Sequence, residues 1–335
     1  MFPNPHTRFA RRRLRAGIVR ARLWRVLGLL LWLLAPFAAA DPVRVQVLLS
    51  ETGGSYAELV EGLEQQLNAR APGQIRLQVQ RVPEGTAQLA ALLAEPPALI
   101  VPIGIRATAL ALRDAGSLPV LSLLIPQASY TALLNAAPTT TGQKRSAIYL
   151  DQPLSRQLDL LQALLPGARR IATLTGPTSQ AQTAELQALS TQRGLRLATQ
   201  SVADGANPIQ ALTPLLEQAE VLLALPDPAV FNRASLQAIL LTTYRSGVPV
   251  LGFSQAYVRA GALAAVHSTA QQIGRQAGDW LAELARSGQW QLGAPRYPTY
   301  YSVSVNRQVA QSLGIHVADE ATLLAQLRKR DPVQP

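Results

Sequence analysis

The stretch PVLGFSQAYVRAGALAAV, residues 249–266, reads as an apolar strand, a Gly-Phe-Ser turn, a helix and a second apolar strand. Two strands joined through a helix lie parallel in one sheet, and the helices cover the faces of that sheet. Short apolar runs alternate with helical patterns along the rest of the chain in the same way. These runs predict strands at 43–49, 75–79, 98–103, 119–125, 170–174, 196–200, 221–225, 248–251, 262–266 and 300–305.

The alternation predicts an α/β fold with parallel sheets. It is interrupted at residues 126–147, which are polar and rich in turn-forming residues, with about four strands before the interruption and five after it. We therefore predict two Rossmann-like lobes with parallel sheets, joined by a hinge near residues 124–151; a single sheet is the alternative. Helices are expected at 55–70, 105–114, 154–165, 179–193, 208–218, 229–246 and 268–286.

The two lobes are expected to exchange segments of the chain. Lobe 1 is assigned residues 41–150 and about 267–290, and lobe 2 residues 151–266 and about 291–325. The charged end, residues 326–335, is expected to be a flexible tail.

The first forty residues account for most of the charge. The chain of 335 residues has a formal charge of +11, but residues 1–40 hold eight arginines and no acid, which leaves 23 basic and 20 acidic side chains in the remainder. The excess of basic residues therefore belongs mainly to a leader segment, and nucleic acid is not expected as a partner.

This leader has the layout of a secretory signal peptide. An arginine-rich start precedes the apolar run VLGLLLWLLA (residues 26–35), and small residues at Ala38 and Ala40 predict cleavage after Ala40. The apolar run is shorter than the roughly 20 residues that span a membrane. We expect a periplasmic protein whose signal peptide is removed.

Residue composition excludes several kinds of chemistry. The chain has no cysteine, which excludes disulfides, thiolate metal sites and a lipoprotein anchor. Its three histidines give no metal-ligand cluster, and neither a P-loop nor a G-x-G-x-x-G follows a strand. We expect no metal and no cofactor.

A serine hydrolase is the enzymatic alternative, because G-F-S-Q-A at residues 252–256 is one residue from the nucleophile elbow G-x-S-x-G. The chain order Ser254, Asp279, His316 also matches that fold. However, Asp279 lies in a helical pattern, no His-Gly oxyanion segment lies upstream, and the elbow ends in Ala256. We therefore expect a protein that is not an enzyme.

Small and polar residues follow the predicted strands. In open α/β sheets, ligands bind beyond the carboxyl ends of the strands, where helices begin and their backbone N–H groups are free. The same residue types also cap helices, so each one alone has a structural explanation. Taken together, they predict a binding cleft between two lobes.

Several segments resemble one family. VLLALPDPAVF (221–231) followed by PVLGFSQAYVRAGALAAV (249–266) resembles the periplasmic substrate-binding proteins of ABC transporters, in the branch of tryptophan- and tyrosine-type binders. YSVSVNRQVAQSLGI (301–315) is similar to the terminal segment of that branch, and IGRQAGDWLAEL (273–284) and LLQALLPGARRIATL (160–174) are similar to further parts. The resemblance implies the type I periplasmic-binding fold, whose lobes close on a small molecule.

By this resemblance, Asp227 and the turn Phe253–Ser254 line the cleft from lobe 2. Lobe 1 departs from the family pattern, because Ile105 and Arg106 replace a threonine-containing segment and Ile125-Pro126 replaces an Asp-Pro pair. The ligand is then either different from an aromatic amino acid, with a carboxylate facing Arg106, or the cleft has lost its transport function. The predicted ligand-binding residues are Ser50, Glu51, Ser55, Tyr56, Gly104, Arg106, Asp151, Thr175, Asp227, Phe253 and Ser254.

We expect a monomeric periplasmic solute-binding protein that closes on an amino-acid-like molecule or carboxylate and delivers it to the membrane permease of an ABC transporter. The alternative is a ligand-sensing or protein-interaction subunit with a degenerate cleft, not coupled to transport.

Overall fold

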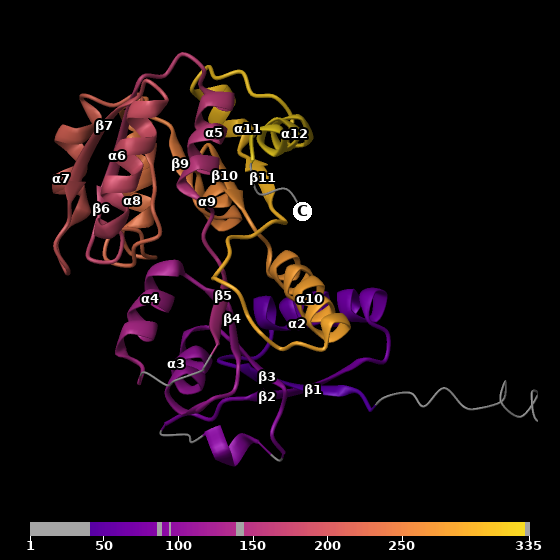
Figure 1. Ribbon diagram of the computed structural model, residues 1–335. Coiled ribbons are helices and arrows are strands. Elements are labelled where there is room, and N and C mark those ends of the chain that lie inside the picture. The colour runs from indigo at the N-terminus through magenta and orange to yellow at the C-terminus, as the bar shows by residue number, and fades with distance from the viewer. Residues whose placement is uncertain (1–40, 86–88, 94, 139–143, 332–335) are drawn as a thin grey trace, which may run out of the picture. The chain divides into compact units, whose positions relative to one another are not determined.

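The first sheet contains five parallel strands in the order β2-β1-β3-β4-β5 (Figure 1). The computed structural model describes residues 41–85, 89–93, 95–138 and 144–331. Strands β1 and β3 are buried on both faces, as parallel strands between helical layers must be. The elements of this part are β1 (Val43–Leu49), α2 (Gly54–Arg70), β2 (Ile75–Arg81), the 3-10 helix η2 (Leu89–Leu92), β3 (Leu99–Ile103), α3 (Ile105–Asp114), β4 (Val120–Ile125), α4 (Gln127–Ala136) and β5 (Arg145–Tyr149).

The second sheet contains six strands in the order β11-β10-β9-β8-β6-β7, and all neighbours are parallel except β10 and β11. Its strands and helices are α5 (Leu154–Leu164), β6 (Arg170–Thr175), η3 (Gln180–Gln182), α6 (Thr183–Gln192), β7 (Arg196–Ser201), α7 (Pro208–Leu216), β8 (Val221–Leu223), α8 (Leu236–Arg245), β9 (Val250–Gly252), α9 (Gln255–Ala260), β10 (Ala264–His267), β11 (Ser302–Val305), α11 (Arg307–Ser312) and α12 (Glu320–Arg330). The predicted α/β architecture with parallel sheets in two lobes is confirmed.

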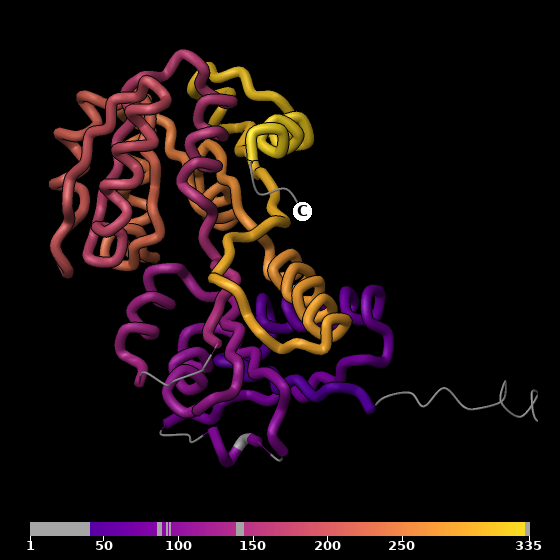
Figure 2. Tube along the Cα trace, viewed as in Figure 1, coloured from indigo at the N-terminus to yellow at the C-terminus, as the bar shows by residue number. Residues whose placement is uncertain are grey.

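Helix α10 (Ala270–Ser287) follows β10 in the chain but packs against α2 of the first lobe, beside which it lies in Figures 1 and 2. Leu59 and Leu63 of α2 and Ile273 and Trp280 of α10 are buried in the same core cluster as β1, β3 and β4. Gly274 faces the backbone of α2 so closely that a Cβ atom there would meet the carbonyl oxygen of Leu59. Small residues on α10 therefore allow the two helices to approach.

The chain passes between the lobes three times, as the trace in Figure 2 shows. We name residues 150–153, 268–269 and 297–301 the first, second and third crossing segments. Gln152 of the first donates to the hydroxyl of Ser268 in the second at 2.9 Å. The Ser268 hydroxyl in turn donates to the carbonyl of Tyr300 in the third at 2.7 Å. One chain of hydrogen bonds thus joins all three segments.

Arg156 on α5 extends this network and is only 2% exposed. Its guanidinium donates to the carbonyl of Pro298 at 2.9 Å and to the side chain of Gln152, and it lies over the ring of Tyr301, 3.9 Å from its centroid. Its Nε also donates to the carboxylate of Asp331 at 2.9 Å. A buried charge is stable only when it is paired and hydrogen-bonded, and Arg156 meets both conditions.

Two expectations from the sequence differ from the structure. Residues 126–147 contain helix α4 and most of strand β5, whose short RSAIY sequence follows polar residues and begins with two of its own. The chain leaves the first lobe only at the first crossing segment, at the end of the expected hinge. Residues 326–330, expected in a flexible tail, belong to α12, where Leu327 is 1% exposed.

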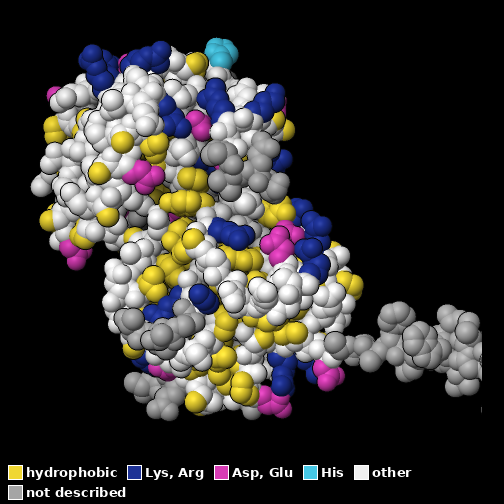
Figure 3. Space-filling view, viewed as in Figure 1, with side chains coloured by type: hydrophobic (Ala, Val, Ile, Leu, Met, Phe, Trp, Pro, Cys, Tyr) yellow, Lys and Arg dark blue, Asp and Glu magenta, His cyan; other side chains and the backbone are white. Residues whose placement is uncertain are grey.

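The predicted signal peptide, residues 1–40, lies outside the described residues. No helix of the described part is long and apolar enough to cross a membrane. On the face seen in Figure 3, Lys and Arg side chains are interspersed with Asp and Glu, in line with the small net charge beyond residue 40.

Candidate functional site

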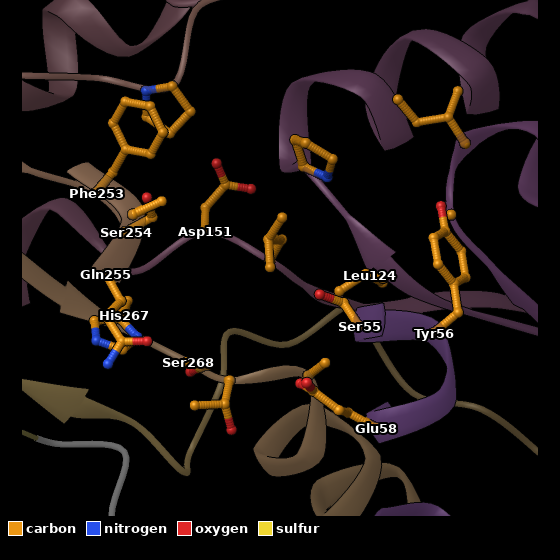
Figure 4. Close-up of a pocket in the computed structure, with 18 of the residues that line it drawn as sticks. Ser55, Tyr56, Glu58, Leu124, Asp151, Phe253, Ser254, Gln255, His267 and Ser268 are labelled. Carbon is orange, nitrogen blue, oxygen red and sulfur yellow. The ribbon is translucent and has the colours of Figure 1, made fainter. Parts of the chain in front are cut away.

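A cleft of about 1000 Å³ lies at the carboxyl ends of strands from both sheets (Figure 4). Its walls come from the segments that follow β1, β3, β4 and β5 in the first lobe and β8, β9 and β10 in the second. Nine of the eleven residues predicted from the sequence line it: Ser50, Glu51, Ser55, Tyr56, Gly104, Arg106, Asp151, Phe253 and Ser254.

Gly104 fixes the wall of the first lobe. It is the N-cap of α3 and has φ 85° and ψ 172°, a conformation that is essentially limited to glycine. A Cβ atom here would lie 2.6 Å from the Tyr56 hydroxyl and 2.8 Å from the Ser50 hydroxyl. Ser50 accepts a hydrogen bond from the N–H of Ala107 at 2.9 Å, so it caps α3 from a neighbouring strand. Burial raises the pKa of Tyr56, and the charge of Glu51 raises it further.

Arg106 is already engaged by groups of the protein. Its guanidinium donates to the carbonyl of Ser50, and Nη2 lies 3.6 Å from the carboxylate of Glu51. Its buried Nε has no hydrogen-bond partner within the described chain. The charge of Arg106 is therefore partly neutralised by Glu51 before any ligand enters.

Asp151 lies in the first crossing segment and projects into the cleft (Figure 4). Its carboxylate accepts the backbone N–H of Gln127, at the start of α4, at 2.5 Å. Burial raises the pKa of Asp151, and the hydrogen bond from Gln127 opposes this shift without cancelling it. No Lys or Arg of the described residues forms an ion pair with this carboxylate.

The second lobe contributes an aromatic wall and a helix cap. Phe253 packs against Tyr257, with ring centroids 4.3 Å apart, and against Phe231 at 6.3 Å. Ser254 is the N-cap of α9, and its hydroxyl accepts the N–H of Tyr257 at 3.4 Å. The Gly-Phe-Ser turn thus begins a helix at the edge of the cleft.

The three residues of the hydrolase alternative are not brought together. Asp279 bonds to Gln66 and Tyr300, and His316 lines a separate pocket beside Gly314. The one histidine that lines the cleft, His267, is 2.9 Å from Ser304 through its Nε2. Ser254 therefore has no hydrogen-bonded histidine in the described structure and acts as a helix cap.

Thr175 and Asp227 do not line the cleft, which corrects their assignment as site residues. Both are 2% exposed. The Asp227 carboxylate accepts the N–H groups of Thr178, Ser179 and Ala229 at 3.0, 2.8 and 2.9 Å and also the Ser179 hydroxyl. These donors use the oxygens that a ligand would need, so Asp227 fastens two loops together.

Sequence reasoning missed several apolar residues of the cleft. Ile105 and Leu150 also line it and are 51% and 38% exposed, which is unusual for large aliphatic side chains. Leu124 also lines it and has φ 53°, the only positive φ of a non-glycine residue in the described ranges. Each lies at or just beyond the end of a strand, where only polar residues indicate a binding site from sequence alone.

The titratable residues that line the cleft also include Glu58, Arg259 and His267, which were not predicted. The pKa of His267 is lowered by burial and by the nearby charge of Arg259. Arg259 itself donates to the side chain of Gln255 at 2.9 Å. The described residues contain no group of three or more His, Cys, Asp or Glu side chains placed to hold a metal ion.

Comparison with known proteins gives a family and a fold. A profile described as ABC transporter substrate binding protein matches residues 44–328. No curated protein matches the sequence.

Three solved structures are similar in fold. A ligand-free, open substrate binding protein with adhesive properties from Clostridium difficile has a TM-score of 0.66 and 15% identity, covering 83% of this chain and 96% of its own. An ABC domain in complex with L-Trp from Streptococcus pneumoniae has a TM-score of 0.57 and 18% identity, covering 85% and 98%. A conserved domain protein from Vibrio cholerae gives the same values. The profile match covers most of the chain, which therefore belongs to the family of ABC transporter substrate-binding proteins.

Proposed function

We propose that this protein binds a small, amino-acid-like molecule in the cleft and delivers it to the permease of an ABC transporter. The observation that supports this most directly is the cleft itself, which both lobes line at the carboxyl ends of their strands. Ligands of open α/β sheets bind at this edge. A large apolar pocket with a few convergent polar groups is the usual form of a small-molecule site.

The proposed ligand contacts come from both lobes. Ser55 lies in the first turn of α2, whose N-cap residue Gly53 provides no side-chain hydrogen bond, so the first N–H groups of the helix suit a carboxylate. Ile105, Leu150 and Phe253 offer apolar surface to the body of the ligand. The remaining proposed contacts are Ser50, Glu51, Tyr56, Gly104, Arg106, Asp151 and Ser254.

Binding would act through the three crossing segments. A ligand that contacts both walls stabilises the closed arrangement of the lobes, because it has more contacts there than in an open one. The permease then distinguishes loaded from empty protein by this change. Members of the family typically work outside the cytoplasm, and we propose that residues 1–40 direct export and are removed after Ala40. We propose binding without a catalytic step, since Ser254 caps a helix.

Thermal unfolding of residues 41–335, most of which form one compact unit, tests this function. The panel contains amino acids, small carboxylates, amines and dipeptides. A ligand at about 100 times its dissociation constant adds about 2.7 kcal/mol to the free energy of unfolding. A chain of this length should then melt a few degrees higher. A panel without any response would contradict the proposal and favour a protein-interaction role for a degenerate cleft.

A further inference from the structure

Asp151 is a carboxylate in the cleft whose charge the protein leaves largely uncompensated. Both arginines of the cleft have other partners, since Arg106 contacts Ser50 and Glu51, and Arg259 contacts Gln255. The Gln127 N–H is the only hydrogen-bond donor that another described residue gives to the Asp151 carboxylate. A half-buried carboxylate with so few partners favours a ligand that brings the opposite charge.

We infer that Asp151 binds a protonated amine of the ligand, and that Gln127 and Tyr297 hold its carboxylate in position. The inference rests on the proposed function and names the chemical class of its ligand: an ammonium group attached to an apolar body. An anion that lacks an amine is disfavoured near Asp151, because like charges repel strongly where water is excluded.

The positioning contacts run from the third crossing segment to the first. The Tyr297 hydroxyl donates to the side-chain oxygen of Gln127 at 2.8 Å, and the Gln127 N–H donates to Asp151. The ring of Tyr297 also packs edge-on against Tyr149, with centroids 5.4 Å apart. Asp151 is therefore held by a residue whose own side chain is fixed from another crossing segment.

The apolar surroundings support the same ligand class. Leu124, Leu150, Pro126 and Phe253 line the cleft together with Asp151. A charge-assisted hydrogen bond is stronger in such surroundings than in water. An amine with an aliphatic or aromatic body fits both features.

Asp151 also caps the N-terminus of α4, and this structural role alone would not require a charge. An asparagine retains an oxygen that can accept the Gln127 N–H, so Asp151→Asn preserves the cap and removes the negative charge. Comparison of these two side chains separates ligand binding from support of the helix.

The inferred amine contact has a defined pH dependence. The carboxylate must be ionised to pair with an ammonium, and burial raises its pKa in the free protein. Affinity for an amine is therefore full well above that raised pKa and is lost as the pH falls through it. The other titratable or charged groups around the cleft are Tyr56, Tyr149, Tyr297, Glu51, Glu58, Arg106, Arg259 and His267.

The first experiment compares three forms of one ligand body by isothermal titration of residues 41–335. The probes are L-tryptophan, tryptamine and indole-3-propionate, and a second set is L-leucine, 3-methylbutylamine and 4-methylpentanoate. We expect binding by the members that carry an amine and none by the two acids. Asp151→Asn should weaken amine binding about 10- to 100-fold, the loss that follows removal of a charged hydrogen-bond partner.

Glu58→Gln is the matched control, because it removes one negative charge from the same cleft but leaves Asp151 in place. It should change amine affinity by less than about threefold, since Glu58 is exposed to solvent. The inference would be overturned if the acids bind the wild-type protein as tightly as the amines do and Asp151→Asn does not weaken amine binding. The solute-binding function would still stand in that case. If no probe binds to the wild-type protein but a compound without an amine raises the melting temperature in the thermal panel, the inference fails and the solute-binding function stands. If the whole panel is silent as well, both fail.

The positioning role is tested with tryptamine, whose amine stays protonated from pH 4 to 8. Affinity for the wild-type protein should fall in acid, and Asp151→Asn should remove that step. Tyr297→Phe deletes the hydroxyl that fixes Gln127, so we expect weaker binding and a displaced pH midpoint. A pH profile unchanged from wild type would overturn the positioning role. A step retained by Asp151→Asn would assign the titration to His267 instead and overturn the role of Asp151.

Discussion

Gly104 sets the shape of the cleft at the scale of a single residue. Its φ of 85° and ψ of 172° suit only glycine, and the hydroxyls of Tyr56 and Ser50 occupy the space of a side chain. Gly104→Ala should therefore lower the free energy of unfolding by about 2–4 kcal/mol, from backbone strain and from the displaced side chains. Tyr56 must move, so ligand affinity should fall as well.

Gly116→Ala is the matched comparison for Gly104→Ala in urea unfolding. Gly116 also has a positive φ, 58°, but a Cβ atom there would have no neighbour within 4 Å. This substitution should cost only the conformational penalty of about 1 kcal/mol. Equal losses of unfolding free energy for both variants would show that the crowding by Tyr56 and Ser50 at position 104 adds nothing to the cost.

The residues of the site could be predicted only in part from the sequence. Ser50, Gly104 and Ser254 follow apolar strands and were found by this position. Asp227 has the same signature but points into its own loops, and nothing in the local sequence separates an aspartate that binds a ligand from one that accepts four protein donors. Ile105 and Leu150 were missed, because exposure of an aliphatic side chain is a property of the folded surface.

At the scale of elements, the contact of α2 with α10 depends on glycines. A Cβ atom at Gly274 would meet the backbone of Leu59, which cannot move aside as a side chain can, and one at Gly278 would lie 2.6 Å from the side chain of Gln66. Gly274→Ala should thus destabilise the protein by about 1–3 kcal/mol, although alanine favours helix formation more than glycine does.

Gly167→Ala serves as the control for Gly274→Ala in the same denaturation experiment. Gly167 lies between α5 and β6 with no positive φ and no neighbour within 4 Å of a Cβ atom. We expect a change within about 0.5 kcal/mol. A tolerated Gly274→Ala would mean that α10 can shift away from α2 at little cost.

Most elements could be predicted because apolar runs in parallel sheets are continuous. The predicted strand at 43–49 coincides with β1, and the predicted helix at 105–114 coincides with α3. Strand β5 begins with the polar residues Arg145 and Ser146, has only three apolar residues, Ala147 to Tyr149, and follows a polar segment of the sequence. It forms because pairing with β4 and the bridge between Ile148 and Arg296 complete its hydrogen bonds. Strand β4 and Arg296 both lie outside the local sequence of β5, so a local pattern cannot predict this pairing.

For the whole molecule, Arg156 links the three crossing segments to the end of the chain. Arg156→Met would leave the Asp331 carboxylate, 7% exposed, without this partner. Loss of one partner from a buried ion pair costs about 3–5 kcal/mol, which is measurable by urea unfolding. Asp331→Asn in the same chain should recover part of that loss, because the side chain left in this buried place is then neutral.

The ion pair of Arg307 with Glu320 provides the control for Arg156→Met. Both of its side chains are largely exposed, at 57% and 43%. Arg307→Met should therefore cost less than about 1 kcal/mol. A comparable effect of both substitutions would contradict a special role for the buried arginine.

The placement of α10 has a consequence for how the protein is made. A nascent chain that has reached Tyr149 carries all five strands of the first sheet, but the helix that covers α2 and β4 begins only at Ala270. Until then, Leu59, Leu63 and their neighbours have no complete core to enter. Domains usually fold as units while the chain emerges, but here neither lobe is complete until most of the chain has been synthesised. The order of segments in the gene thus delays folding.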